Sequence, residues 1–208
     1  MSLVPHVLAP HVAGAEIEDS GQKVVLHPQE TTIVTRSGEK HRRDFTLGRF
    51  CAHAALAQLG GAGGAIGRGG NGAPVWPAGF SGSITHTAGY AAALVARTSC
   101  FLSLGVDAER VGGIGDNLMP RLFDTAERAL LADLTEERRK LVATILFSAK
   151  EATFKALNPV TGKKLSFPDI HVELAETIFR ATCGSQEVAG NFAVGGDLVL
   201  TSAFLPAP

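Results

Sequence analysis

Residues 147–157 read FSAKEATFKAL, and this stretch decides how the C-terminal part of the chain folds. Phe147 and Phe154 are seven residues apart, and Leu157 follows three residues later. This spacing places all three on one face of a helix, where they form a stripe for the core. We therefore predict a helix over Leu141–Leu157 that Pro159 prevents from continuing.

The same stretch carries Glu151 and Lys155, four residues apart on a different helix face. One interpretation is a surface ion pair worth roughly 0.3–0.5 kcal/mol. The other makes Glu151 a metal ligand or a base and the lysines of the stretch phosphate partners. The helix alone does not decide between them.

Two carboxylates precede this helix, at the end of an apolar segment. Ser103–Glu109 has the composition of a strand, and in a strand Asp107 and Glu109 point to the same face. Adjacent carboxylates repel each other unless a cation, a proton or a basic partner lies between them. A Mg²⁺ site fits this pattern, because Mg²⁺ uses one or two carboxylates together with waters and phosphates. The alternative is a pair of solvated acids with Arg110 as their counter-charge.

The first half of the chain has a basic helix. Arg42–Leu59 is rich in helix formers, and Gly60 and Gly61 end it. Arg42 and Arg49 are two turns apart and share a face, with His53 one turn further on that side. Two guanidinium groups on one face can hold a phosphate. A solvated face neutralised by Glu39 and Asp44 is the alternative.

The remaining pattern predicts an α+β fold. The loop Gly60–Gly72 formally contains GxGxxG, but no strand precedes it and no helix follows it, which disfavours a dinucleotide-binding turn. Ser83–Thr87 and Tyr90–Arg97 predict a hairpin around Ala88-Gly89, with Thr85 and His86 on opposite faces of the first strand. Asp124–Leu134 predicts a short helix with a capping box. Further strands are predicted at Lys23–Leu26, Thr31–Thr35, His171–Ala175, Ile178–Thr182 and Leu198–Phe204.

Composition limits the partners. The 208 residues contain 19 Lys plus Arg against 20 Asp plus Glu, a net charge of −1, so we expect neither nucleic-acid nor membrane binding. Cys51, Cys100 and Cys183 form no CxxC pair, and the N-terminus has no basic residue before an apolar run. Both features predict a cytoplasmic protein. Neither HExxH nor GxSxG occurs, which disfavours zinc catalysis and an α/β-hydrolase.

Taken together, the motifs are more specific than any one of them. In their order and spacing they resemble the larger class of 4'-phosphopantetheinyl transferases, the surfactin-synthetase-activating and enterobactin-type enzymes. The blocks that carry the resemblance are Arg42–Phe45 through Gly48–Ala52, Gly72–Pro77, Gly82–Thr87, Gly105–Glu109 and Phe147–Ala156.

The resemblance implies a fold and a reaction. Two similar α/β halves, 1–102 and 103–208, would be related by a pseudo-twofold axis, each a small, mostly antiparallel sheet with a main helix and with the cofactor in the cleft between them. A monomer would hold the whole site. The 4'-phosphopantetheine arm of coenzyme A would move to a serine of an apo acyl or peptidyl carrier protein, releasing 3',5'-ADP. Rival readings are another Mg²⁺-dependent phosphoryl or pyrophosphate enzyme and a non-catalytic protein that binds coenzyme A or a carrier.

The resemblance also implies residue roles. Mg²⁺ would be held by Asp107, Glu109 and Glu151, with Glu151 as the base for the carrier serine and Lys155 stabilising the leaving phosphate. Coenzyme A would contact Arg42, Arg49, Arg68, Thr85, His86, Lys150 and Lys155.

Two positions depart from the family pattern. Thr87 stands where many relatives have Cys or Ser, and Asn71 stands where a basic residue is common. Arg68 would then supply the missing loop cation.

A surface for the carrier is a further expectation. The apolar residues Ile114, Leu118, Met119, Leu122 and Phe123 would form either a docking surface or a buried linker. Because carrier proteins tend to be acidic, Arg121 and Arg128 would steer them.

Overall fold

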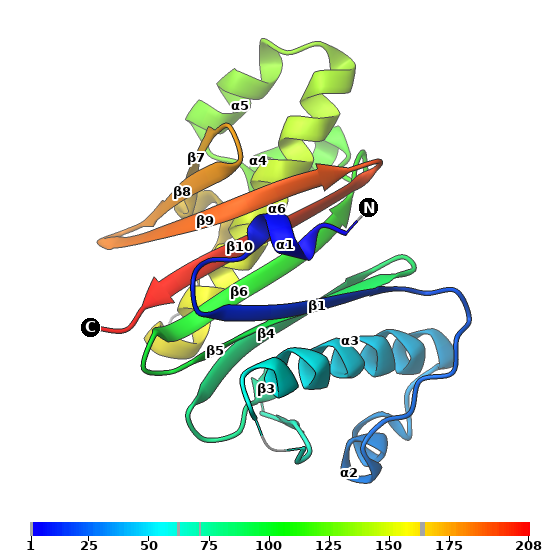
Figure 1. Ribbon diagram of the computed structural model, residues 1–208. Helices are drawn as coiled ribbons and strands as arrows, with labels where there is room; N and C mark the ends of the chain where they lie inside the picture. Colours follow the sequence, from blue (N-terminus) through cyan, green and yellow to red (C-terminus); the bar gives the residue numbers. More distant parts are fainter. Residues whose placement is uncertain (1, 62, 71, 163–164) are drawn as a thin grey trace.

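The computed structural model describes residues 2–61, 63–70, 72–162 and 165–208. Within them, two antiparallel sheets are each covered by a long helix, as Figure 1 shows. The first sheet has the order β1-β5-β4, formed by Val12–Glu18, Tyr90–Arg97 and Phe80–Thr87. The second has the order β6-β10-β9-β8-β7, formed by Phe101–Arg110, Leu198–Pro206, Gln186–Gly195, Ile178–Cys183 and His171–Ala175. The predicted α+β class is confirmed, and the pseudo-twofold axis stays a prediction.

Helix α3 (Glu39–Gln58) covers the first sheet. Its apolar face buries Leu47, Cys51 and Leu56 against the alanine-rich strand β5. The predicted helix and the β4–β5 hairpin are therefore confirmed. The strands predicted at Lys23–Leu26 and Thr31–Thr35 are wrong. The first segment has no regular structure, and the second lies in α2 (Pro28–Thr31) and the 3₁₀ helix η1 (Thr32–Val34). Helix α2 begins with Pro28 at its first position and the His27 side chain as its cap, two signals that outweigh the β-branched residues that follow.

Helix α6 (Glu136–Thr161) covers the second sheet. It continues through Pro159, contrary to the predicted stop. Near a helix end a proline removes a single backbone hydrogen bond, and the last turn tolerates this loss. Gly162 ends the helix instead, in the left-handed conformation with φ of 60°.

Shorter helices and a hairpin fill the connections. The capping box predicted at Asp124 is present at the start of α5 (Thr125–Ala132). Before α5 lie η2 (Asp116–Leu118) and α4 (Met119–Leu122), and after α6 lies η3 (Phe167–Asp169). Within the predicted Gly-rich loop, β2 (Gly67–Arg68) pairs with β3 (Pro74–Val75), a hairpin that the glycine content concealed. Strand β9 was also missed in the sequence, since Gly190 and Asn191 interrupt its apolar alternation.

Two strands join the sheets to each other. Hydroxyl groups of β4 accept hydrogen bonds from the backbone of β6: Ser83 Oγ from Val106 N at 3.0 Å, and Thr85 Oγ1 from Ala108 N at 3.1 Å. The strands of the first sheet come from residues 12–97 and those of the second from residue 101 onward, while α1 (Val4–Val7) packs near β9 and β10 of the second sheet. No described helix combines the length and the apolar character needed to cross a membrane.

Candidate active site

Three carboxylates gather where β6 meets α6. Asp107 and Glu109 come from alternate positions of the strand, and Glu151 comes from the helix. The helix can lie this close because Gly105 has no side chain: a Cβ there would come within 1.8 Å of the Ala152 carbonyl oxygen. We call Asp107, Glu109 and Glu151 the acid cluster.

Burial and the repulsion between neighbouring carboxylates raise the pKa of two members of the acid cluster. Burial, followed by the charges of Asp107 and Glu151, raises the pKa of Glu109 to about 7. Burial and Asp107 also raise the pKa of Glu151. Such mutual repulsion fits a group of carboxylates that binds a cation.

Lys155 partly neutralises the cluster. Its Nζ donates to Asp107 Oδ1 at 2.7 Å and to the Val106 carbonyl at 3.1 Å. Ser148 Oγ donates to the other oxygen of Asp107 at 3.0 Å. Glu151 and Lys155 are therefore not a simple surface pair, because Lys155 binds the strand acid.

A cavity of about 490 Å³ opens beside Lys155. Apolar side chains from three regions line much of it: Trp76, Phe80, Ile84, Leu102, Phe154 and Pro159. Among the described residues the lining is mainly apolar and includes one lysine, Lys155, and we call this space the large cavity.

A second, smaller cavity of about 180 Å³ contains Arg49, Arg68 and His86. It shares the lining residues Gly72, Pro74 and Ile84 with the large cavity, so the two cavities adjoin. Arg49 is only 4% exposed, and its Nη2 donates to the Gly67 carbonyl at 2.9 Å. Its Nε and Nη1 have no hydrogen-bond partner among the described residues. We call this cavity the basic pocket.

Two side chains of the basic pocket were not predicted. His41 and Asp44 line it from α3, and Asp44 Oδ2 lies 3.9 Å from Nδ1 of His86. Burial lowers the pKa of His86, and Asp44 opposes that shift. The sequence does signal both residues, since they lie within the basic segment, His41 eight and Asp44 five residues before Arg49.

The structure places three predicted coenzyme A contacts elsewhere. Arg42 is exposed and donates to the Ser37 carbonyl at 3.1 Å, outside the lining of the basic pocket. Thr85 is buried between β4 and β6, where its hydroxyl serves the junction of the sheets. Lys150 is fully buried. Each of the three side chains is engaged within the protein, and their contacts with coenzyme A stay predictions.

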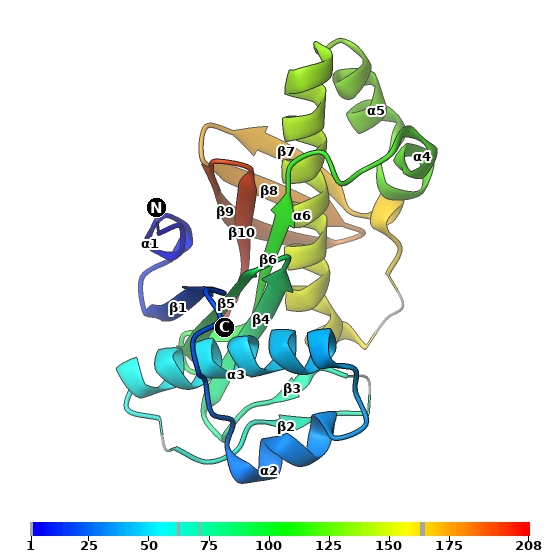
Figure 2. The same cartoon turned by 90° about the vertical axis from the view of Figure 1, so that its right-hand side faces the viewer.

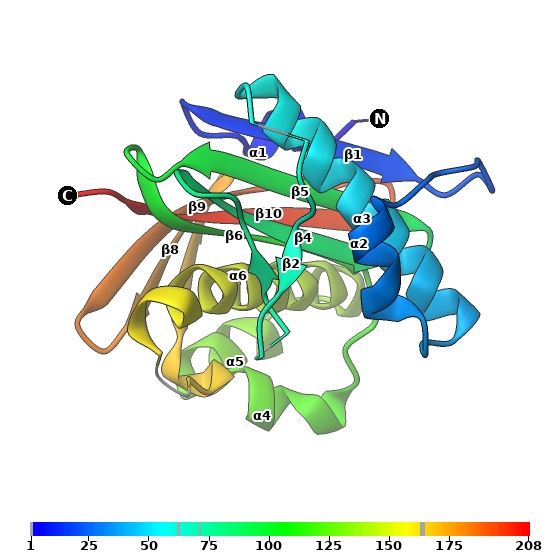
Figure 3. The ribbon, with the colours of Figure 1, turned by 90° about the horizontal axis from the view of Figure 1, so that it is seen from below.

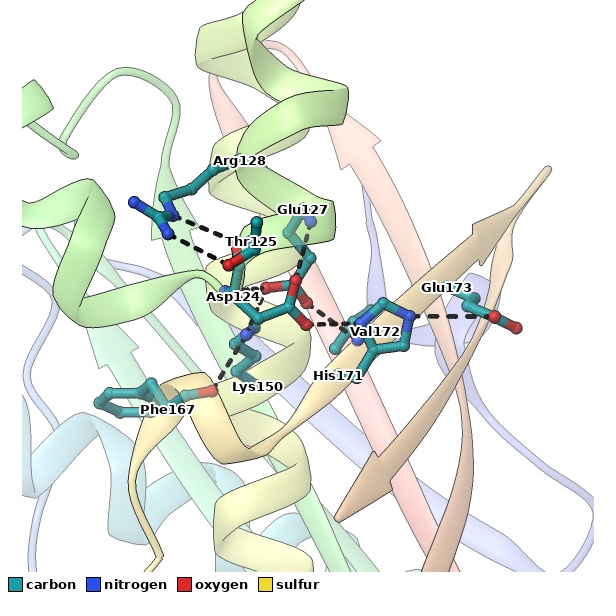
Figure 4. Close-up of polar contacts among 9 residues, drawn as sticks. All are labelled: Asp124, Thr125, Glu127, Arg128, Lys150, Phe167, His171, Val172 and Glu173. Carbon is teal, nitrogen blue, oxygen red and sulfur yellow. Dashed lines mark hydrogen bonds and ion pairs between the residues drawn. The ribbon is translucent and has the colours of Figure 1, made fainter. Parts of the chain in front are cut away.

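The buried Lys150 side chain binds residues of neighbouring elements, as Figure 4 shows. Its Nζ lies 2.5 Å from Glu127 Oε2 and donates to the Phe167 carbonyl at 3.0 Å. Glu127 also caps α5 and accepts from Val172 N at 2.9 Å. Lys150 thus ties the middle of α6 to α5, η3 and β7.

Three residues beside Lys150 have the types and the spacing of a metal site. Asp124, Glu127 and His171 have ligand atoms within 4.8 Å of one another. Lys150 already supplies a cation to Glu127, and His171 Nδ1 lies 2.6 Å from Asp124 Oδ2 (Figure 4). Each of these three side chains therefore has a partner in the protein, and we assign no metal there.

The predicted carrier surface is only partly exposed. Leu118 is 36% exposed, whereas Phe123 is fully buried beneath Lys150. Ile114, Met119 and Leu122 are partly buried against the core. The buried-linker alternative is thus correct for Phe123. Of the two departures from the family pattern, Thr87 ends β4, and Asn71 lies outside the described residues.

Comparison with known proteins accounts for this arrangement. Residues 29–96 match the 4'-phosphopantetheinyl transferase N-terminal domain, and residues 103–193 match the model of the 4'-phosphopantetheinyl transferase superfamily. This chain belongs to that superfamily. It is an enzyme of the larger type, as the relatives described next support.

Several curated relatives are similar over most of the chain. The 4'-phosphopantetheinyl transferase Npt of Nocardia iowensis is 39% identical over 82% of this chain and 76% of that protein. PptT of Mycobacterium tuberculosis is 37% identical over 82% and 75%. Enterobactin synthase component D of Salmonella typhi is 33% identical over 59% and 50%. A solved holo-(acyl-carrier-protein) synthase from Bacillus anthracis, in complex with CoA (3',5'-ADP), is 22% identical, with a TM-score of 0.46 over 52% of this chain and 99% of that one.

Proposed function

We propose that this transferase moves the 4'-phosphopantetheine arm of coenzyme A to a serine of an apo acyl or peptidyl carrier protein and releases 3',5'-ADP. The observation that carries the proposal is that the two cavities adjoin and that Lys155, in the wall of the large cavity, pairs with Asp107 of the acid cluster. The buried Arg49 and the exposed Arg68 line the basic pocket, so cationic side chains and carboxylates both lie close to the adjoining cavities. Residues 1–102 would bind the phosphates, and residues 103–208 would supply the metal ligands and the base.

The basic pocket would bind the nucleotide end of coenzyme A. Arg49 has two unpartnered donor nitrogens among the described residues, and a phosphate can accept from both. Arg68 and His86 line the same pocket. Because burial lowers the pKa of His86, we assign it a neutral hydrogen-bonding role at pH 7.

The large cavity would hold the pantetheine arm. Its volume lies within the usual range for small-molecule sites, and its apolar walls suit an extended chain of methylene and amide groups. Lys155, in its wall, would contact the phosphate from which 3',5'-ADP leaves.

The acid cluster fits Mg²⁺. Its three carboxylates are hard oxygen ligands, and burial together with the neighbouring carboxylates raises the pKa of Glu109 and of Glu151, a cost that a bound cation would relieve. Asp107, Glu109 and Glu151 would hold the ion, which when bound neutralises charge on the pyrophosphate.

Glu151 would also act as the base. The pKa of Glu151 is raised from its ordinary value toward pH 7, which suits a group that accepts a proton. The proton of the carrier serine passes to Glu151, directly or through water. The serine oxygen forms a bond to phosphorus as the bond to the 3',5'-ADP oxygen breaks.

The carrier would approach along the segment that contains Leu118 and Arg121. Both side chains are exposed, and Arg121 would attract an acidic partner. The cytoplasmic location, the monomeric state and the absence of nucleic-acid and membrane partners stay predictions from composition and resemblance.

Intact-mass spectrometry of a purified apo carrier protein tests the proposal. After incubation with this chain, coenzyme A and Mg²⁺, we expect a mass gain of one phosphopantetheine, located at a serine. Hydrolysis of coenzyme A without carrier labelling would instead favour another phosphoryl or pyrophosphate enzyme. Binding of coenzyme A with neither product would favour a non-catalytic binding protein.

A further inference from the structure

Glu30 is a buried carboxylate that takes no part in the proposed transfer. It lies in α2 with a fully buried side chain. Its Oε1 accepts from Ile66 N at 2.8 Å and lies 2.9 Å from His53 Nε2. Its Oε2 has no hydrogen-bond partner among the described residues. Burying a carboxylate costs free energy unless nearby groups compensate for its charge. We therefore ask what the buried charge of Glu30 contributes.

The contacts of Glu30 lead directly to the basic pocket. Ile66 immediately precedes strand β2, whose Gly67 carbonyl accepts from Arg49 Nη2 at 2.9 Å. The next residue, Arg68, lines the pocket itself. Glu30 therefore anchors the short strand that holds one arginine and carries the other. Figure 2 shows α2, α3 and the β2–β3 hairpin gathered at one end of the molecule, and Figure 3 shows α2 beside α3 from below.

Glu30 also contributes charge to the pocket. Burial lowers the pKa of the Arg49 guanidinium group, and the charge of Arg68 lowers it further. The charge of Glu30 opposes this shift. Helix α3 packs tightly here, since a Cβ on Gly48 would come within 2.7 Å of Ile84 Cγ2. The Arg49 guanidinium group itself donates to the Gly67 carbonyl and lies 4.8 Å from the centroid of the Phe45 ring, and the Glu30 charge offsets its repulsion from Arg68.

We propose that Glu30 is a positioning residue for the coenzyme A phosphates, which fixes the backbone of β2 and balances the charge of Arg49 so that Arg49 and Arg68 face the same ligand. This inference rests on the proposed function only in the identity of the ligand. Glu30 would act through the two arginines and would not touch the ligand.

Glu30→Gln tests the proposal. It keeps the size of the side chain and an acceptor for Ile66 N but removes the charge. We expect 3',5'-ADP to bind about tenfold more weakly, and the KM for coenzyme A to rise by a similar factor. The kcat at saturating coenzyme A should stay within about twofold, and the KM for the carrier should not change.

Glu16→Gln is the matched control. Glu16 also accepts backbone hydrogen bonds in the N-terminal half, from Leu3 N and Val4 N, but it does not line the basic pocket. Its variant should lose some thermal stability and bind 3',5'-ADP as the wild type does. Unchanged affinity in a folded Glu30→Gln variant would overturn the proposal, and so would equal losses of affinity in the two variants.

Variants at His53 keep the proposal testable if Glu30→Gln does not fold. His53→Ala removes one partner of the carboxylate, whereas His53→Gln can still donate from its Nε2. We expect His53→Ala to bind 3',5'-ADP about threefold more weakly and His53→Gln to restore the affinity. Wild-type affinity in both would contradict the proposal. Binding of 3',5'-ADP requires no transfer, so a wild-type chain that binds it but labels no carrier would refute the proposed function and not the role of Glu30.

Discussion

The acid cluster and the basic pocket are built in different ways, although the large cavity adjoins the pocket and its Lys155 binds the cluster. The acids lie on two regular elements, a strand with alternating side chains and a helix held close to it by Gly105. The pocket combines α3 with the two-residue strand β2. Glu30, which is far from β2 in the sequence, anchors that strand through Ile66 N. This difference predicts that the acid cluster controls turnover and that the basic pocket controls affinity for coenzyme A.

The largest effect is expected at the base. Glu151→Gln preserves the size of the side chain but cannot accept the serine proton, so kcat should fall by about 10²–10⁴-fold. Steady-state transfer to an apo carrier measures this effect. A variant that keeps more than a tenth of the wild-type kcat would exclude Glu151 as the base.

A buried and an exposed lysine of α6 extend the comparison to stability, because Lys150 has a buried acidic partner and Lys140 an exposed one. Lys150→Met leaves Glu127 buried without its counter-charge, which should lower the free energy of unfolding by about 3–5 kcal/mol. Lys140→Met, on the same helix, breaks only the exposed pair with Glu136 and should cost roughly 0.3–0.5 kcal/mol. Urea titration of both variants tests this contrast, which equal losses would refute.

Arg49→Ala should act mainly on affinity. It removes charge-assisted hydrogen bonds to a phosphate, so we expect the KM for coenzyme A to rise by about 10–100-fold with a much smaller change in kcat. Arg43→Ala is the control, because Arg43 lies on the same helix but pairs with Asp19. Arg42→Ala should resemble this control. If Arg42→Ala raises the KM as much as Arg49→Ala does, Arg42 contacts coenzyme A, as the resemblance predicts.

The smallest expected effect is a pH-dependent stability difference at Glu109. In the folded protein without metal its pKa is about 7, above the ordinary value of 4.5, so loss of the proton as pH rises from about 5 to 8 destabilises the fold. Glu109→Gln lacks this penalty and should gain about 1–2 kcal/mol over the wild type across that range in EDTA. Thermal unfolding measures this difference, which Mg²⁺ should reduce. A difference that does not change with pH would contradict the assignment.

The sequence indicated the acid cluster better than the basic pocket, for a physical reason. Asp107, Glu109, Glu151 and Lys155 follow the periodicities of a strand and a helix, which are local properties. The anchor of the pocket depends on a contact between Glu30 and Ile66, which no local pattern indicates. The two lysines of one motif show the same limit, since only the packing of α5 against α6 distinguishes Lys150 from Lys155.

Calorimetric titration of 3',5'-ADP in EDTA tests most directly whether the basic pocket, and not the acid cluster, controls affinity for the nucleotide. Without metal, the basic pocket alone should determine this affinity. We predict that Arg49→Ala weakens binding by about tenfold or more, while Glu151→Gln stays within about threefold of the wild type. Weaker binding in Glu151→Gln together with wild-type binding in Arg49→Ala would contradict this account of the cleft.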